Sequence, residues 1–201
     1  MSTAKQREVH SVESYLAQFG QSDSRLEFVN GDVRAMTAPT IRHNIIATNV
    51  LVALGVKLKG SKCRAFNSNS LVRIRHENST WLYFPDASVV CESNSQSELF
   101  QDQPTLVVEV LSPSTRSIDL DEKVEQYLSI ASLEAYLIVE QDKPYAILYQ
   151  RKPDGFLRES IDGIGKAIHL PFISVTLSLS DIYEGVKFPP PIVHATEVGY
   201  G

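Results

Sequence analysis

The sequence predicts an α/β protein in which helices flank a central mixed β-sheet. Helical and strand-like patterns alternate along the chain, without the regular repetition of a doubly wound fold. Residues 105–111 form an apolar run of the kind that fills a buried strand. The 201 residues suffice for one domain with its own core. We expect that domain at residues 1–187, followed by a loose C-terminal tail at 188–201.

The first half of the chain carries clear turn and cap signals. A short helix is expected at 11–19, then a hairpin whose turn is Asn30-Gly31, a dipeptide that suits tight hairpins. Thr40 is a suitable N-cap for a long helix that ends near Lys59, because Gly60 follows. Strands are expected at 62–67, 71–75, 81–84, 87–91 and 105–111, with a polar loop at 93–103.

The second half predicts one helix and then several strands. The helix is expected at 119–130, and the strands at 135–140, 144–151 and 156–161. The last two strands are joined by a turn at 153–155, and a short helix follows near 180–184.

Composition and missing motifs exclude several classes of function. A net charge of -5 argues against a protein that coats nucleic acid by charge alone, but not against an acidic site neutralised by a divalent cation. The chain lacks both glycine-rich phosphate-loop motifs, so nucleotide-cofactor chemistry is not expected. Cys63 and Cys91 have no CxxC or Cys/His cluster around them, so no zinc site is expected.

The same reasoning predicts a cytoplasmic protein. The N-terminus is polar and shows no apolar signal core, and the longest apolar stretch, at 45–56, is too short to span a bilayer. We therefore expect no membrane association and a reducing, cytoplasmic setting.

Glu109 is the strongest sign of chemistry. It interrupts the apolar run at 105–111, where an ionised carboxylate would cost several kcal/mol unless it were paired or bound to a metal. A purely structural pairing with an arginine or with backbone donors is the alternative interpretation.

Asp86 is the second candidate carboxylate. It follows Pro85 at the start of an apolar strand, where a kink or strand end is expected. The 23 residues between Asp86 and Glu109 allow two neighbouring strands to bring both acids together, and a divalent cation would relieve their repulsion. Taken alone, Pro85-Asp86 is better interpreted as ordinary turn chemistry.

Lys123 is the third candidate. Its helix returns the chain over the sheet, so its side chain could place a positive charge beside a phosphate or a water. A surface ion pair with Asp119, four residues earlier, is an equally good interpretation of the spacing.

Together these residues resemble the PD-(D/E)XK nuclease superfamily, which has the restriction-endonuclease-like fold. The pattern normally places a lysine two residues after the second acid, where this chain has Leu111. A subgroup carries the lysine on the following helix instead, and Lys123 fits that position. The sequence resembles more specifically the Uma-type family of restriction-endonuclease-like proteins. The matching motifs are residues 26–31, His43, Pro85-Asp86, residues 108–115, Asp119, Lys123, Tyr127 and residues 133–136.

The resemblance implies a divalent-metal-dependent endonuclease that hydrolyses DNA phosphodiester bonds. It implies that Asp86, Glu109 and the Val110 carbonyl bind Mg²⁺, with Mn²⁺ as an alternative, and that Lys123 orients or helps to deprotonate the attacking water. Glu27 resembles the extra acidic residue that supports such sites, although a surface role in the hairpin is equally compatible with its position. The role of His43 stays open between substrate contact and a structural position at a helix start.

Two other classes of function compete with a nuclease. A non-catalytic nucleic-acid-binding or protein-interaction module on the same fold is favoured by Leu111 and by the acidic net charge. A glycosidase could also use two carboxylates, but the single Trp81 offers little surface for sugar stacking. We also expect a homodimer, because twofold assembly is the commonest arrangement of soluble oligomers.

Overall fold

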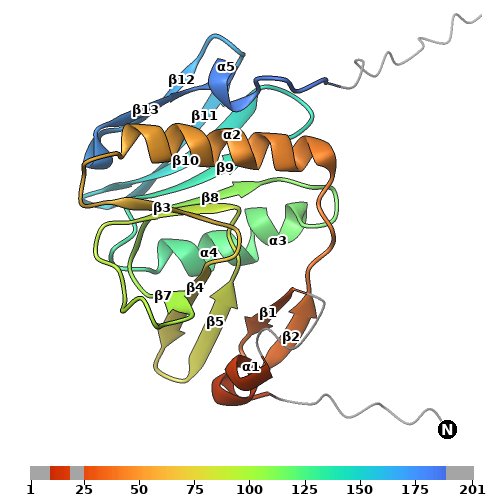
Figure 1. Cartoon of the computed structure of the whole chain (residues 1–201), viewed down its shortest axis with the longest axis vertical. Coiled ribbons are helices and arrows are strands. Elements are labelled where there is room, and N and C mark those ends of the chain that lie inside the picture. Colours follow the sequence, from red (N-terminus) through yellow and green to blue (C-terminus); the bar gives the residue numbers. More distant parts are fainter. Residues whose placement is uncertain (1–9, 19–24, 189–201) are drawn as a thin grey trace, which may run out of the picture.

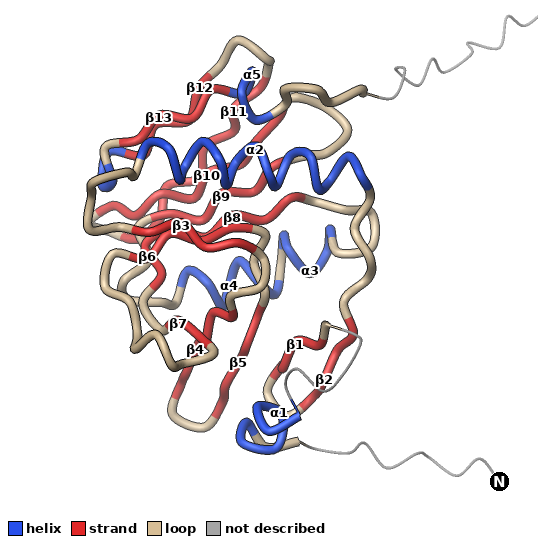
Figure 2. The backbone as a smooth tube through the Cα atoms, in the orientation of Figure 1, coloured by secondary structure: helices blue, strands red, loops and turns tan. Residues whose placement is uncertain are grey.

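A six-stranded mixed sheet forms the centre of the protein. The computed structural model describes residues 10–18 and 25–188. The central sheet is antiparallel except for β8 and β9, which run parallel (Figures 1 and 2). In spatial order its strands are β11 (Gly155–Asp162), β10 (Tyr145–Lys152), β9 (Ala135–Val139), β8 (Pro104–Val110), β6 (Ala87–Val90) and β3 (Arg64–Asn67).

A second sheet and a short ribbon complete the strands. In the second sheet the order is β2 (Asp32–Ala35), β1 (Leu26–Val29), β5 (Ser79–Tyr83), β4 (Leu71–His76) and β7 (Phe100–Gln101). The ribbon pairs β12 (Ala167–Leu170) with β13 (Val175–Ser178). The helices are α1 (Val12–Gln18), α2 (Ile41–Lys57), α3 (Arg116–Leu120), α4 (Glu122–Leu128), the 3₁₀ turn η1 (Pro171–Ile173) and α5 (Leu179–Ile182).

Strand β8 has a buried layer on each of its faces. Leu106, Val108 and Val110 point toward α2, in one core cluster with the buried face of that helix. Val107 lies in the opposite cluster, which contains Tyr127 of α4. Figure 1 shows α2 on one side of β8 and α4 on the other. Glu109 alternates with Val108 and Val110, so it points toward the α4 side of the sheet.

The mixed α/β fold class is confirmed, and several element boundaries differ from the prediction. The expected helix at 119–130 begins earlier, at Arg116, and is interrupted at Asp121, whose backbone angles are φ -119° and ψ -80°. The polar loop at 93–103 contains the two-residue strand β7, which pairs in parallel with β4. Phe100 of this strand is covered by the Arg73 guanidinium, 3.6 Å from the ring centre, so a tertiary contact accompanies it.

Strands β12 and β13 were not predicted, although the sequence carried a signal for them. Both show alternating burial, with Ile168, Leu170, Val175 and Leu177 pointing inward. A period of two over four residues is short, and this made the pattern easy to miss. Residues 189–201 of the predicted C-terminal tail lie outside the described residues. So does Phe19, the last residue of the predicted N-terminal helix.

Cys63 and Cys91 are joined by a disulfide. Pairing of Arg64 with Val90 in β3 and β6 brings the two neighbouring cysteines opposite each other. The expected reducing setting did not anticipate this bond, because a separation of 28 residues in sequence does not reveal strand pairing. None of the helices in the described ranges has the length and apolar composition that crossing a membrane requires.

Arg151 anchors the C-terminal end of α4 to the central sheet. Its guanidinium donates from Nε to the Leu133 carbonyl at 2.6 Å and from Nη2 to the Ile130 carbonyl at 2.7 Å. Both carbonyls follow the helix, where backbone oxygens have no partner within it. The side chain on β10 thus fixes the helix that carries Lys123.

We expect Arg151→Met to lower the free energy of unfolding by about 2 kcal/mol, because two charge-assisted hydrogen bonds are lost. Chemical denaturation followed by circular dichroism measures this change. The matched control is Arg158→Met on the exposed strand β11, which should change stability by less than about 0.5 kcal/mol. Equal stability of the two variants would contradict the anchoring role.

Candidate functional site

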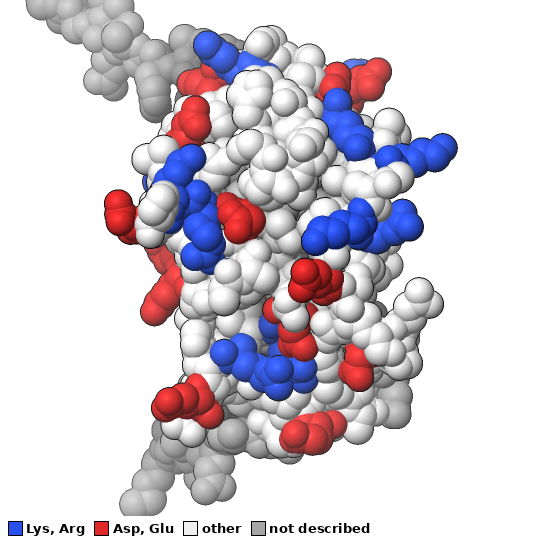
Figure 3. Space-filling view, turned by 90° about the vertical axis from the view of Figure 1, so that its left-hand side faces the viewer, with Lys and Arg blue, Asp and Glu red and all other residues white. Residues whose placement is uncertain are grey.

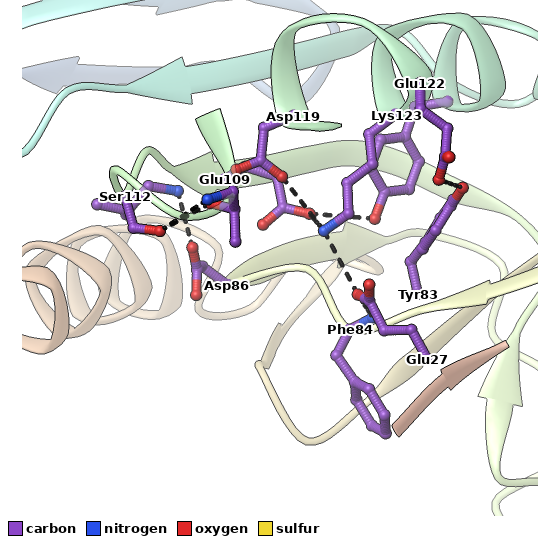
Figure 4. A network of polar contacts seen from close by, with 12 residues as sticks. Glu27, Tyr83, Phe84, Asp86, Glu109, Ser112, Asp119, Glu122 and Lys123 are labelled. Atoms are coloured by element: carbon purple, nitrogen blue, oxygen red, sulfur yellow. Dashed lines mark hydrogen bonds and ion pairs between the residues drawn. The ribbon is translucent and has the colours of Figure 1, made fainter. Parts of the chain in front are cut away.

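Glu109 and Lys123 form a buried ion pair between the central sheet and α4. The Lys123 ammonium lies 2.9 Å from Oε1 of Glu109, and both residues are 4% exposed. The Tyr127 hydroxyl, one helical turn after Lys123, donates to the same oxygen at 3.3 Å. Figure 4 shows Glu109 and Lys123 converging from β8 and α4.

Two further carboxylates contact the same ammonium group. Lys123 Nζ lies 3.3 Å from Oδ1 of Asp119 and 3.4 Å from Oε1 of Glu27. Asp119 precedes Lys123 by one helical turn, whereas Glu27 comes from β1. Glu27 also accepts a hydrogen bond from the Phe84 backbone N–H at 3.0 Å, so its carboxylate is held from two sides.

Glu122 connects the hairpin of β1 and β2 to α4. Its carboxylate accepts hydrogen bonds from Nη1 of Arg34, at 2.8 and 2.9 Å, and from the Tyr83 hydroxyl at 2.8 Å. Arg34 is the cross-strand partner of Glu27. Glu122 therefore binds Arg34 while its neighbour Lys123 binds Glu27, the cross-strand partner of Arg34. These two contacts fix Glu27 beside the ammonium.

Asp86 completes the site from the neighbouring strand. Strand β6 begins at Ala87, opposite Val108, so β8 extends beyond its partner. The Val110 N–H at this extension donates instead to Oδ2 of Asp86, at 2.7 Å. The Asp86 carboxylate is thus placed at the end of β8 that also carries Glu109.

His43 contacts Asp86 from the first turn of α2. The helix begins at the expected N-cap, where the Thr40 hydroxyl accepts from the His43 N–H at 3.2 Å. The ring Nε2 lies 3.2 Å from Oδ2 of Asp86, and Nδ1 is buried without a hydrogen-bond partner in the described part of the chain. His43 therefore lies against a candidate metal ligand.

The cluster carries more negative than positive charge. Burial raises the pKa of Glu109 well above its ordinary value; Lys123 opposes the shift, while Asp119, Asp86 and Glu27 add to it. Burial by itself would lower the pKa of Lys123, but the carboxylates of Glu109, Glu27 and Asp119 raise it well above its ordinary value. Lys123 is therefore an ammonium, and the cluster favours either a proton on Glu109 or an added cation.

The other titratable neighbours respond to the same charges. Burial opposes ionisation of His43 most strongly, but the hydrogen bond to Asp86, the charge of that carboxylate, the Val110 backbone and Asp119 together outweigh burial and raise the histidine pKa. Burial, reinforced by Glu109, raises the pKa of Tyr127, which keeps the hydroxyl protonated as a donor.

The donor chemistry of the site fits a hard divalent cation. Asp86 and Glu109 supply carboxylate oxygens, and the contacts described above use neither Oδ1 of Asp86 nor Oε2 of Glu109. Mg²⁺ prefers one or two carboxylates and keeps several waters. No group of three or more His, Cys, Asp or Glu side chains in residues 10–18 and 25–188 is arranged as a metal cluster. A site with two carboxylates and a backbone carbonyl does not require such a cluster.

The structure brings together the residues selected from the sequence. Glu27 and Glu109 both contact Lys123, and Asp86 is bound to the backbone beside Glu109. The Lys123–Asp119 pair exists, but it is buried and is one of three ion pairs, not a surface contact. Leu111, at the usual lysine position, is 1% exposed in the core, and this leaves Lys123 as the cation of the site.

Asp119 and Tyr127 also belong to the cluster, although neither was predicted as a site residue. Their spacing gave a usable signal, because Asp119, Lys123 and Tyr127 are separated by four residues each and so share one helical face.

Comparison with known proteins gives the fold first and the family second. A crystal structure described as a "putative nuclease belonging to DUF820" from Anabaena variabilis superposes with a TM-score of 0.69 at 17% identity. The match covers 87% of this chain and 98% of that one, so the protein has a restriction-endonuclease-like fold. The pattern of the Uma2 family, described as "Putative restriction endonuclease", matches residues 12–180. The protein therefore belongs to the Uma2 family.

Two cyanobacterial relatives carry no assigned function. The uncharacterized protein slr1290 of Synechocystis is 29% identical over 179 residues, covering 89% of this chain and 93% of the relative. The uncharacterized protein sll1609 from the same organism is 26% identical over 125 residues, covering 61% and 70%.

Substitution of Lys123 should lower the stability of the protein, whereas substitution of Glu109 should not. Lys123→Met leaves three buried carboxylates without their ammonium, and we expect it to cost at least about 3 kcal/mol. Glu109→Gln removes one excess negative charge, so the metal-free variant should be as stable as wild type or more so. Urea denaturation measures both, and a Glu109→Gln variant as unstable as Lys123→Met would contradict this charge balance.

The raised pKa of Glu109 also predicts a pH dependence of stability. Between the ordinary value of 4.5 and the raised folded-state pKa, the folded protein binds more protons at Glu109 than the unfolded chain does. The contribution of this residue to the free energy of unfolding therefore falls as pH rises through that interval. Denaturation of metal-free wild type and Glu109→Gln over this range measures the difference, which should grow with pH; parallel curves would refute the shift.

Proposed function

We propose that the protein is a divalent-metal-dependent endonuclease that hydrolyses DNA phosphodiester bonds. The observation that supports this most strongly is the buried contact between Glu109 and Lys123, with Asp86 fixed beside it by the Val110 N–H. A buried lysine surrounded by three carboxylates gives no evident advantage in stability over an apolar core. Membership of a family with a restriction-endonuclease description agrees with a catalytic reason for the cluster.

Asp86, Glu109 and the Val110 carbonyl would hold the ion, with Mg²⁺ as the natural occupant and Mn²⁺ as an alternative. When bound, the ion would act as a Lewis acid on the phosphate and lower the pKa of water. It would also balance the negative charge of the four neighbouring carboxylates, which the single Lys123 ammonium compensates only in part.

Lys123 would stabilise the charge that develops on the phosphate. Its ammonium is fixed by Glu109, Glu27 and Asp119 at distances of 2.9 to 3.4 Å, so it requires little reorganisation during the reaction. Since the lysine is protonated, it acts in this proposal by orienting water and donating hydrogen bonds, not as the base. Glu27 would keep the ammonium aimed between β1 and β8.

Cleavage by purified protein tests this proposal. We expect supercoiled DNA to be nicked only with added Mg²⁺ or Mn²⁺, and Asp86→Asn, Glu109→Gln and Lys123→Met each to lose at least about 100-fold in rate. Glu125→Gln, an exposed carboxylate on the same helix, is the matched control and should cleave like wild type.

The same experiment distinguishes a nuclease from a non-catalytic binding module on the same fold. A protein that binds DNA without metal-stimulated cleavage is the non-catalytic alternative. Wild-type cleavage that persists in Glu109→Gln would instead reveal a contaminating nuclease or a different active site. Stabilisation of wild type by Mg²⁺ in thermal unfolding, lost in Asp86→Asn, measures metal binding independently of activity.

A homodimer and a cytoplasmic location are also part of this proposal. Twofold assembly is common among soluble proteins, and light scattering of the purified protein measures its mass in solution. Localisation of a tagged full-length protein by cell fractionation tests the compartment, on which persistence of the Cys63–Cys91 bond would also depend.

A further inference from the structure

A pocket with a mixed polar and apolar lining lies along the outer edge of β3. Its volume is about 570 Å³, within the range of small-molecule sites. β3 is an edge strand of the six-stranded sheet, and the opposite wall comes from residues 93–101. The lining is rich in side-chain amides and includes one half-buried aromatic ring on β3: Asn67, Asn69, Asn94, Gln96, Gln101 and Phe66.

The pocket adjoins the candidate active centre through strand register. Asn67, which lines it, pairs directly with Ala87, the residue after Asp86. The next residue along the chain, Ser68, accepts from Nη1 of Arg25 at 3.4 Å. Arg25 directly precedes β1, the strand from which Glu27 contacts Lys123. One end of the pocket is therefore connected to the site by Arg25 and Ser68.

Arg25 has one donor for which the described part of the chain offers no partner, while its positive charge interacts with the site carboxylates of Asp86, Glu27 and Glu109. Its Nη2 is buried and has no hydrogen-bond partner among the described residues, whereas Arg34, Arg73 and Arg116 each pair with a carboxylate. The guanidinium carbon lies over the Phe84 ring, 4.6 Å from its centre, in a cation–π contact. An unpaired buried donor is costly, and a planar guanidinium matches the geometry of a phosphate.

The lining of the pocket suits an unpaired nucleobase. Asn and Gln side chains can donate and accept at once, so they match the edges of bases. Phe66 offers a ring for stacking, which is the usual way in which single strands are bound. A base inside a duplex could not enter such a pocket, because its edge is already paired. On the face drawn in Figure 3, basic and acidic side chains are interspersed, and this surface provides no broad basic track for a duplex.

We propose that this pocket binds an unpaired nucleotide of the substrate and that Arg25 binds the phosphate linking it to the scissile bond. The inference rests on the proposed nuclease function and names its substrate class as single-stranded nucleic acid, or a single-stranded end or flap of a duplex. Asn69 and Gln96 contact the base, and Arg25 aligns the strand with Asp86 and Lys123.

Binding measurements on the full chain test this proposal. A fluorescent single-stranded DNA oligonucleotide and its blunt duplex are titrated by anisotropy in the Glu109→Gln background with Mg²⁺, so that no cleavage interferes. We expect the single strand to bind about tenfold or more tightly than the duplex. Arg25→Met should weaken single-strand binding about tenfold and lower the salt slope by about 0.7, since one phosphate contact is lost.

Variants separate the base contacts from the phosphate contact. Asn69→Ala combined with Gln96→Ala should weaken single-strand binding about fivefold without changing the salt slope. Arg158→Met on β11 is the matched control and should bind within about twofold of the background protein. Arg25→Lys retains the charge and should keep the salt slope while losing affinity, which provides a second test if Arg25→Met folds poorly.

The outcomes distinguish this inference from the proposed function. If wild type cleaves DNA but the Arg25 and pocket variants bind and cleave single strands like the control, the pocket inference is overturned and the nuclease proposal stands. If no metal supports cleavage while these variants still weaken single-strand binding, the pocket stands as a binding site and the nuclease proposal fails. Tighter binding of the blunt duplex would also overturn the inference.

Discussion

The ammonium group of Lys123 is the contact on which the local structure depends. It lies in the interior within 3.4 Å of Glu27, Glu109 and Asp119, which come from β1, β8 and α3. Carboxylates this close repel one another strongly in a medium of low dielectric constant, and one ammonium compensates only part of that repulsion. The remaining negative charge favours a cation beside Asp86 and Glu109. This arrangement is poor for stability, and its excess of negative charge fits the divalent cation proposed above.

The surrounding fold supplies rigid support for this cluster. Arg34, Tyr83 and Glu122 join the hairpin to α4, and Arg151 fixes the far end of the same helix through backbone carbonyls. Asp86 is fixed differently, by a backbone N–H that becomes free where β8 extends beyond β6. Each acidic group is thus positioned by a regular element or its end, and a site on rigid elements keeps its geometry. Leu111, at the position where the nuclease pattern usually has its lysine, packs in the core instead.

Prediction from the sequence succeeded where a local pattern had one physical meaning. A carboxylate in an apolar strand, a Thr40 cap and the Asn30-Gly31 turn each impose a local requirement, and all three are found where expected. Asn30 and Gly31 both adopt positive φ, as a tight hairpin turn demands. Prediction failed where tertiary contacts decide. The helix was expected to begin at Asp119, but Asp119 lies inside the charge cluster and the helix begins before it. The short strand β7 pairs with β4, and no sequence period of two residues can reveal that contact.

The sequence by itself determined the chemical types in the site and the strand or helix that carries most of them. It determined that Glu109 needs a partner, because an isolated charge in an apolar strand is too costly. Only the tertiary structure decided which partner that is. Lys123 is 14 positions after Glu109 in the sequence, and Glu27 is much farther away. The three side chains meet because α4 and the hairpin pack on the sheet. The pairing of Asp86 with the Val110 N–H was likewise decided by strand register, and the placement of Arg25 beside Ser68 by the packing of the two sheets. Register depends on long-range burial of whole faces, which no single stretch of residues encodes.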